Sequence, residues 1–331
     1  EESPLFTDEE RLRITNAFSR QLQHRKGEGI YPLQGPPSAV GSRHGQWSAI
    51  SLYCLGRYFN WYYPNAIWEQ CVRGGELGFA SLHRHAWVYG EADNLYWYAT
   101  GTAPILTYMT LTGDRVPLKN GVLPELLKGQ EILASGHVPD WSLESCSMGY
   151  LNKAAYLTGG GRWVEYRSRC KTDTDAFRLG QSYWPEESIV AHEPDDMVGK
   201  WSIHPLPEPV WLSRATGFDL DESFYFGSFR TTTDENGDFI LIDGFNGESR
   251  NPYHTFDILR LRLDGVAVLA GYMNQVQTSA NGLVPPKIAK DAALRRCGVT
   301  GQTVYAVGEV PDASYCSWRR TILQRIGAYA L

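Results

Sequence analysis

The hydrophobic pattern of this chain changes its period once, near Pro185. Before that point apolar residues recur at the spacing of helices, and after it they alternate with a period of two, as in strands. A chain of 331 residues is long enough for two domains. We therefore predict an α+β multidomain protein with a helical domain over 1–184, a Pro-rich linker over 185–209 and an antiparallel β domain over 210–331.

The helical half has recognisable helix starts and stops. Thr7-Asp8-Glu9-Glu10 is a capping box ahead of a helix to about His24, and another helix follows His44. Gly113 and Gly159 each stand where a helix needs a left-handed residue at its end. Their offset is about one helix–turn–helix unit, which predicts an array of α-hairpins and hence an incomplete (α/α) toroid. Further helices are expected at about 64–72, 93–112, 122–134, 141–157 and 162–178.

The sequence pattern of the second half predicts β-hairpins. Asn236-Gly237 is a hairpin turn signal between strands at 223–231 and 239–243, and Asp264-Gly265 predicts the turn after a strand at 255–263. This pattern predicts an antiparallel sheet, arranged as a β-sandwich. In the third strand, one face is expected to carry Leu259, Leu261 and Leu263, and the other Arg260 and Arg262. Because 322–331 still reads as a strand without a closing turn, we expect a chain cut from a longer protein, or one that ends abruptly.

Composition narrows the class of partner. Charged residues make up 21% and the net charge is −6, so we expect neither nucleic acid nor a membrane as partner. No run approaches the roughly 20 apolar residues of a membrane span. Eleven Trp and nineteen Tyr suit stacking on sugar rings, although aromatic-rich cores explain such a content equally well.

Metal and disulfide chemistry have weak support. The six cysteines form no CxxC pair and most lie in apolar helical stretches, which favours buried free thiols over disulfides. His83 and His85 form an HxH pair that lacks a clear third ligand. His254 and Asp257 are the remaining candidates for a structural divalent metal, and no cofactor is required for the chemistry considered below.

Histidine and tyrosine residues at element starts are the candidate catalytic groups. His44 lies where a Gly/Pro-rich loop becomes a helix, and with Arg43 it could clamp a carboxylate or move protons near neutral pH. Tyr96 and Tyr98 begin a later helix, and residues two apart do not share a helical face, so at most one is expected to point into a cleft. His254 opens a strand. Residues expected to contact substrate are Trp47, His85, Glu91, Asn94, Tyr96, Arg250 and Tyr253.

With these residues, the chain resembles the heparinase II/III-like polysaccharide lyases, which join an (α/α) toroid to antiparallel β-sheets. Ser42-Arg43-His44-Gly45 is similar to the Asn-His-Gly start of the family's catalytic helix, with Arg43 in place of Asn. Tyr98, or Tyr96, falls where the family keeps its catalytic tyrosine. The segment 247–265, with His254 and Asp257, is similar to the family's histidine-bearing β-segment.

The resemblance implies β-elimination on a uronic-acid polysaccharide. Arg43 and His44 would neutralise the uronate, which makes the C5 proton acidic. Tyr98 would be the general acid and also a candidate base, with His254 as the alternative base. We expect a secreted or periplasmic protein that acts on an anionic polysaccharide.

Two other functions are compatible with the same residues. A toroidal glycoside hydrolase would need two carboxylates across the cleft, with Glu91 and Asp140 as the first pair to consider. A non-catalytic carbohydrate-binding protein would need only the aromatic side chains. Products with or without a double bond, or no product at all, separate the three.

Overall fold

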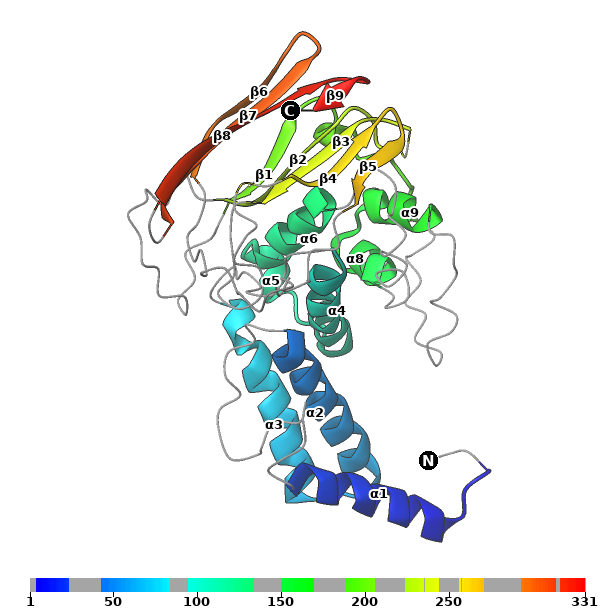
Figure 1. Cartoon of the computed structure of the whole chain (residues 1–331). Coiled ribbons are helices and arrows are strands. Elements are labelled where there is room, and N and C mark those ends of the chain that lie inside the picture. The colour runs from blue at the N-terminus through cyan, green and yellow to red at the C-terminus, as the bar shows by residue number, and fades with distance from the viewer. Residues whose placement is uncertain are drawn as a thin grey trace.

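A computed structural model gives the protein as a set of helices below two stacked sheets (Figure 1). Figure 1 places α1, α2 and α3 at the end of the molecule away from the sheets. The helices α5, α6 and α9 lie closer to the sheets. The structure describes residues 4–23, 43–83, 95–133, 150–169, 188–205, 224–234, 236–243, 256, 258–270, 293–313 and 316–330.

The helices follow the boundaries that the sequence predicts at several ends. The capping box is present, because the Thr7 hydroxyl accepts a bond from the Glu10 amide over 3.3 Å and the Glu10 carboxylate accepts one from the Thr7 amide over 2.8 Å. Gly113 and Gly159 have φ of 73° and 69°, which confirms their left-handed role at helix ends. The helical elements are α1 Asp8–Gln23, α2 Arg43–Tyr62, α3 Ala66–Phe79, η1 Ala80–His83, α4 Leu95–Thr112, α5 Val116–Lys119, α6 Val122–Leu133, α8 Tyr150–Thr158, α9 Gly161–Ser168 and η4 Asp195–Met197.

Two glycines set the close approach of α2 and α3. A Cβ added at Gly56 would lie 2.8 Å from the Cβ of Cys71, and one at Gly75 would lie 2.6 Å from the Cβ of Tyr53. Both distances are too short for real side chains, so only glycine permits this separation of the helix axes. The hairpin that results is one of the α-hairpins expected from the sequence.

The strands form two antiparallel sheets among the described residues, in the orders β1-β2-β3-β4-β5 and β6-β7-β8-β9. Asp264 and Gly265 both have positive φ, 47° and 77°, as a two-residue hairpin turn between β4 and β5 requires. Part of the segment expected to be a linker forms β1. The strands are β1 Trp201–Pro205, β2 Phe224–Arg230, β3 Phe239–Asp243, β4 Ile258–Leu263, β5 Val266–Ala270, β6 Ala293–Thr300, β7 Thr303–Ala313, β8 Cys316–Arg325 and β9 Tyr329–Ala330.

The strands β2 and β3 of the first sheet are buried on both faces. On one face Phe226 and Leu241 pack into the core of the helices, and on the other Phe229 and Ile240 pack into a core shared with the second sheet. The second sheet contributes Val304, Ala306 and Ile322 to that shared core. The layers therefore run from helices to first sheet to second sheet (Figure 1).

The expectation that Leu259 shares a face with Leu261 is wrong. Leu259 packs with the helices, whereas Leu261 packs in the core between the sheets. The cause is a β-bulge: Arg260 pairs with Leu241 and Ile258 with the next residue, Ile242, which leaves Leu259 as an extra residue in β4. Side-chain alternation breaks there, and Arg260 is buried on the helical side.

Three further expectations concern thiols, metals and membranes. Cys54, Cys71 and Cys297 are free thiols, and burial raises the pKa of Cys71 to about 11. Within the described ranges, His, Cys, Asp and Glu side chains form no group of three or more that could hold a metal ion. None of the helices in those ranges is long and apolar enough to cross a membrane.

Candidate functional site

The catalytic candidates of the helical half lie at helix starts. Arg43 and His44 begin α2, while Tyr96 and Tyr98 lie in the first turn of α4. Their backbones are helical, and the placement of their side chains lies outside the described part of the structure. These residues lie at helix starts, where helix dipoles favour negative charge, and their roles stay predictions.

The other predicted site residues have different outcomes. Trp47 lies one turn into α2 and its residue surface is 40% exposed. Seven predicted residues fall outside the described ranges: His85, Glu91, Asn94, Arg250, Tyr253, His254 and Asp257. Their contribution to a site stays a prediction. The two carboxylates of the hydrolase alternative, Glu91 and Asp140, also fall outside those ranges.

Ring contacts join the second half of α4 to α2 and α3. The ring of Tyr108 meets the ring of Tyr53 with centroids 5.3 Å apart and stacks on Phe79 at 4.3 Å. Burial, followed by the nearby carboxylates of Glu76 and Asp114, raises the pKa of Tyr108 to about 12. Tyr108 is therefore a neutral core residue rather than a general base.

His83 lies next to a carboxylate. Its Nε2 lies 2.6 Å from the Asp114 carboxylate. The other oxygen of Asp114 accepts a bond from the Val116 amide over 2.9 Å, so this carboxylate also fixes the start of α5. Asp114 is a partner that the HxH pattern did not indicate, because it lies 31 residues from His83 in the sequence.

A partly buried ion cluster joins α6, α9 and η4. Nη1 of Arg162 in α9 donates to both carboxylate oxygens of Glu131 over 3.0 and 3.1 Å, and its Nη2 donates to Asp196 over 2.8 Å. The Glu131 side chain is only 6% exposed. Burial raises the pKa of Glu131 more than the two arginines Arg162 and Arg230 lower it.

Two arginines of the sheet reach the C-terminal end of α6. Nη2 of Arg230 in β2 donates to the backbone carbonyl of Glu131 over 2.7 Å, and Nη1 of Arg260 in β4 lies 3.5 Å from the carbonyl of Leu133. Those carbonyls lack intrahelical partners and carry the negative end of the helix dipole. Burial lowers the pKa of Arg260 to about 9, and the positive charge of Arg262 adds to this shift.

An open pocket lies beside this cluster, with a volume of about 470 Å³. Its walls carry Lys128 of α6, Arg162 of α9 and Lys200 before β1, together with Trp201. Glu131 and Asp196 compensate Arg162, but neither lysine has an ion pair within the described part of the chain. The pocket therefore offers two ammonium groups and an indole to an anionic ligand.

Sequence reasoning missed this pocket. Lys128 belongs to an ordinary amphipathic helix, and Lys200 lies in the segment expected to be a linker. Neither residue has a motif around it, and only the packing of α6 against β1 and β2 brings the two together. The sequence showed a high Trp content, but it did not indicate that Trp201 lines a pocket.

His204 lies next to this region on β1 and does not serve as a cation. Burial lowers its pKa to about 3, with Lys128 adding to the shift. The nearest carboxylate oxygen, of Glu125, is 3.8 Å from its Nε2, which is too long for a hydrogen bond. His204 is therefore neutral at physiological pH and belongs to the buried interior of the sheet.

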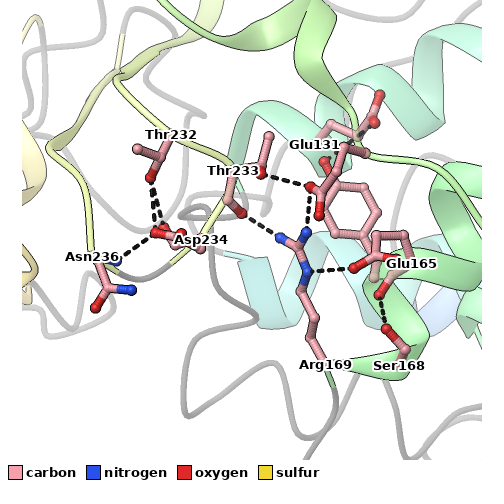
Figure 2. A network of polar contacts seen from close by, with 10 residues as sticks. Glu131, Glu165, Ser168, Arg169, Thr232, Thr233, Asp234 and Asn236 are labelled. Carbon is pink, nitrogen blue, oxygen red and sulfur yellow. Dashed lines mark hydrogen bonds and ion pairs between the residues drawn. The ribbon is translucent and has the colours of Figure 1, made fainter.

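A second polar network surrounds Arg169, directly after α9, and Figure 2 shows it from close by. The guanidinium of Arg169 binds the carboxylates of Glu165 and Glu193 and the backbone carbonyl of Thr233. The Thr233 hydroxyl donates to Glu193 over 2.6 Å. Arg169 thus ties α9 to the segment before η4 and to the β2–β3 loop, which is a structural rather than a catalytic arrangement.

Comparison with solved structures identifies a heparinase-like fold. The chain is similar to a heparan sulfate lyase HepC mutant from Pedobacter heparinus, with a TM-score of 0.50 and 11% identity over 99% of this chain and 50% of that chain. Heparinase III gives a TM-score of 0.35 and 10% identity, over 96% of this chain and 57% of that chain. The chain thus spans about half the length of these structures. No family model and no curated sequence matches it.

Proposed function

We propose that this protein is a polysaccharide lyase that cleaves a uronic-acid-containing polymer by β-elimination. The observation that supports it is the pairing of a heparinase-like fold with His44 at the start of α2 and Tyr98 in the first turn of α4. Histidine and tyrosine supply the acid–base groups that this reaction needs. The HepC mutant of similar fold is described as a heparan sulfate lyase.

The first requirement of the reaction is neutralisation of the uronate. The proton on C5 becomes acidic only when the charge of the adjacent carboxylate is compensated, because the developing enolate is otherwise too high in energy. Arg43 and His44 are the groups assigned to this role. The positive end of the α2 dipole adds to their effect at the same helix start.

The second requirement is proton transfer. In the proposed mechanism Tyr98 or His254 removes the C5 proton, and Tyr98 protonates O4 as the C4–O4 bond breaks. A double bond then forms between C4 and C5 of the sugar at the new non-reducing end. The substrate contacts come from Trp47, Tyr96 and the residues predicted in the loops, and Lys128 and Lys200 are available to an acidic polymer nearby.

The proposal includes the finer architecture. We assign the helices to an incomplete (α/α) toroid over 1–184 and the two sheets, which begin with β1 at Trp201, to a β-sandwich. A secreted or periplasmic location accompanies this assignment, since acidic polysaccharides are extracellular substrates. His254 and Asp257 are kept as the candidates for a structural metal ion.

A panel of acidic polysaccharides tests the proposal. The protein is incubated with alginate, heparan sulfate, hyaluronan and pectin, and the ultraviolet absorbance of the conjugated C4–C5 double bond is followed. A rise in absorbance on one polymer supports the lyase. Cleavage without that absorbance would instead indicate a hydrolase, with Glu91→Gln and Asp140→Asn as the next variants. No cleavage of any polymer would refute both activities.

A further inference from the structure

A hollow of about 560 Å³ lies between the second half of α2 and the end of α4. Its α2 residues recur at helical spacing and therefore share one face of the helix. The volume is in the range of small-ligand pockets. The lining residues are Tyr53, Cys54, Arg57, Tyr58, Trp61, Tyr62, Thr110 and Leu111. None of them belongs to the predicted catalytic set.

The aromatic side chains of this hollow, Tyr58, Trp61 and Tyr62, face solvent. Trp61 is 82% exposed, and no ring contact or hydrogen bond to its indole is found in the described ranges. The rings of Tyr58 and Tyr62 lie 5.1 Å apart at a tilt of 55°. Single exposed aromatics are ordinary, but three within five residues around a hollow form an apolar patch that suits a ligand.

Arg57 supplies the charge of this patch. Its Nη1 donates to the backbone carbonyl of Leu111 over 3.0 Å and lies 3.4 Å from the Tyr53 hydroxyl. These bonds hold the guanidinium at the wall of the hollow. No described residue takes a bond from its Nε or Nη2, and no carboxylate pairs with it within the described part of the chain. The outer edge of the guanidinium is therefore available to an anion, in the geometry that binds carboxylate or sulfate through two parallel bonds.

The combination selects one class of ligand. Flat indole and phenol faces pack against the apolar faces of sugar rings, and Tyr hydroxyls bond sugar oxygens. A neutral sugar would leave the Arg57 charge unused, and a free anion would leave the aromatic rings exposed. An acidic saccharide unit satisfies both features at once.

We propose that Arg57, Tyr58, Trp61 and Tyr62 form a binding site for an acidic saccharide unit, remote from the predicted catalytic residues. The uronate or sulfate group binds the free edge of Arg57, and the sugar ring packs on Trp61. The proposal rests on the proposed function for the identity of the polymer. It extends that function by assigning a second site that anchors the chain of the same polymer.

The distance along α2 separates this site from the predicted catalytic end. Trp61 lies 17 residues after His44 in a continuous helix, which is ~25 Å at about 1.5 Å per residue. A single saccharide unit cannot reach both places. The anchor site should therefore strengthen binding at the catalytic end for long substrates only.

Binding is measured by titrating an acidic hexasaccharide, prepared from heparin, into the full chain and following heat or tryptophan fluorescence. A neutral maltohexaose and free sulfate serve as comparison ligands. Trp61→Ala and Arg57→Gln are each expected to weaken hexasaccharide binding about tenfold, and Trp61→Phe to keep most of it. Leu77→Ala and Arg73→Gln, exposed changes on α3, are the matched controls and should bind as the unmodified protein does.

Several results would overturn this site. Equal hexasaccharide affinity in the unmodified protein, Trp61→Ala and Arg57→Gln would show that these residues do not form a binding site. Equally tight binding of maltohexaose would remove the role of Arg57, and binding of sulfate alone at the same affinity would remove the role of the aromatic rings. Thermal unfolding of each variant checks that the exposed substitutions leave the fold intact.

Kinetics separate this proposal from the lyase proposal. If the protein cleaves a polymer, Trp61→Ala should raise KM for long chains, with kcat unchanged and with no effect on the shortest cleaved oligosaccharide. If no polymer is cleaved but binding still depends on Trp61 and Arg57, the lyase fails and the anchor site stands. If cleavage occurs and neither binding nor KM depends on these residues, the lyase stands and the anchor site fails.

Discussion

Arg230 in β2 donates a hydrogen bond of 2.7 Å to the backbone carbonyl of Glu131, in the last turn of α6. The arginine is fully buried, and its guanidinium lies over the ring of Phe239 with its carbon 5.4 Å from the centroid. The same helix end presents the Glu131 carboxylate to Arg162 of α9. Glu131 of α6 therefore binds both Arg162 of α9 and Arg230 of β2, and the interface between the helices and the first sheet depends on it.

Arg230→Ala should lower the free energy of unfolding by about 3–5 kcal/mol, because it leaves the Glu131 carboxylate and the α6 carbonyl buried with one cation fewer. Arg319→Ala is the matched control, since this strand arginine is 68% exposed and pairs with Glu309 at 3.1 Å. That change should alter stability by less than about 1 kcal/mol. Urea unfolding measures both, and similar losses in the two variants would contradict the role assigned to Arg230.

Two adjacent glycines of α3 should respond in opposite directions to alanine. Gly74→Ala meets only a side-chain carbon of Leu52 at 3.6 Å, so it should stabilise the protein by about 0.5–1 kcal/mol through helix propensity. Gly75→Ala would place its Cβ 2.8 Å from the backbone oxygen of Ala49, so it should destabilise by about 1–3 kcal/mol. Thermal unfolding of the two variants decides, and a destabilised Gly74→Ala would show that the hairpin packs differently.

The stabilising contribution of the Glu193 carboxylate should be lost in acid. The Thr233 hydroxyl, and then Arg169, hold the pKa of this carboxyl below its usual 4.5. A lowered folded-state pKa contributes stability above the unfolded pKa, and that contribution is lost as the pH falls through the folded pKa. Glu193→Gln should thus be less stable than the unmodified protein at neutral pH, and this deficit should be smaller at about pH 3.

Urea unfolding at the two pH values measures this difference. Asp195→Asn, an exposed change in the same segment without an ion pair among the described residues, should show no such convergence. A Glu193→Gln deficit that is the same at both pH values would mean that the carboxylate charge does not carry the effect.

Tyr98→Phe should reduce kcat on the polymer that is cleaved in the panel by about 10²–10⁴, with KM nearly unchanged, because it removes only the acidic hydroxyl. His44→Ala should reduce kcat as well, since the uronate loses a neutralising group. Tyr156→Phe, a partly exposed tyrosine on α8, is the matched control and should keep full activity. Formation of the unsaturated product is the readout, and full activity in Tyr98→Phe would exclude this tyrosine as the acid.

The sequence predicted those features that depend on neighbours along the chain. A capping box and two terminal glycines mark helix ends, and Asp264-Gly265 marks a hairpin turn, because each is fixed by the φ angles and hydrogen bonds of a few consecutive residues. The change of hydrophobic period likewise separates helices from strands. The same local signals placed His44 and Tyr98 at helix starts.

Which residues contact one another depends on packing between distant segments. Leu259 leaves the face of Leu261 because a bulge shifts the register with β3, and Arg230 and Arg260 are buried because the end of α6 lies over the sheet. The pocket with Lys128 and Lys200 and the hollow with Arg57 and Trp61 arise in the same way. The sequence thus predicts several helix ends and a hairpin turn, which local backbone geometry controls. Their burial, ion pairs and pockets depend on contacts between segments far apart in the chain, and packing alone sets these.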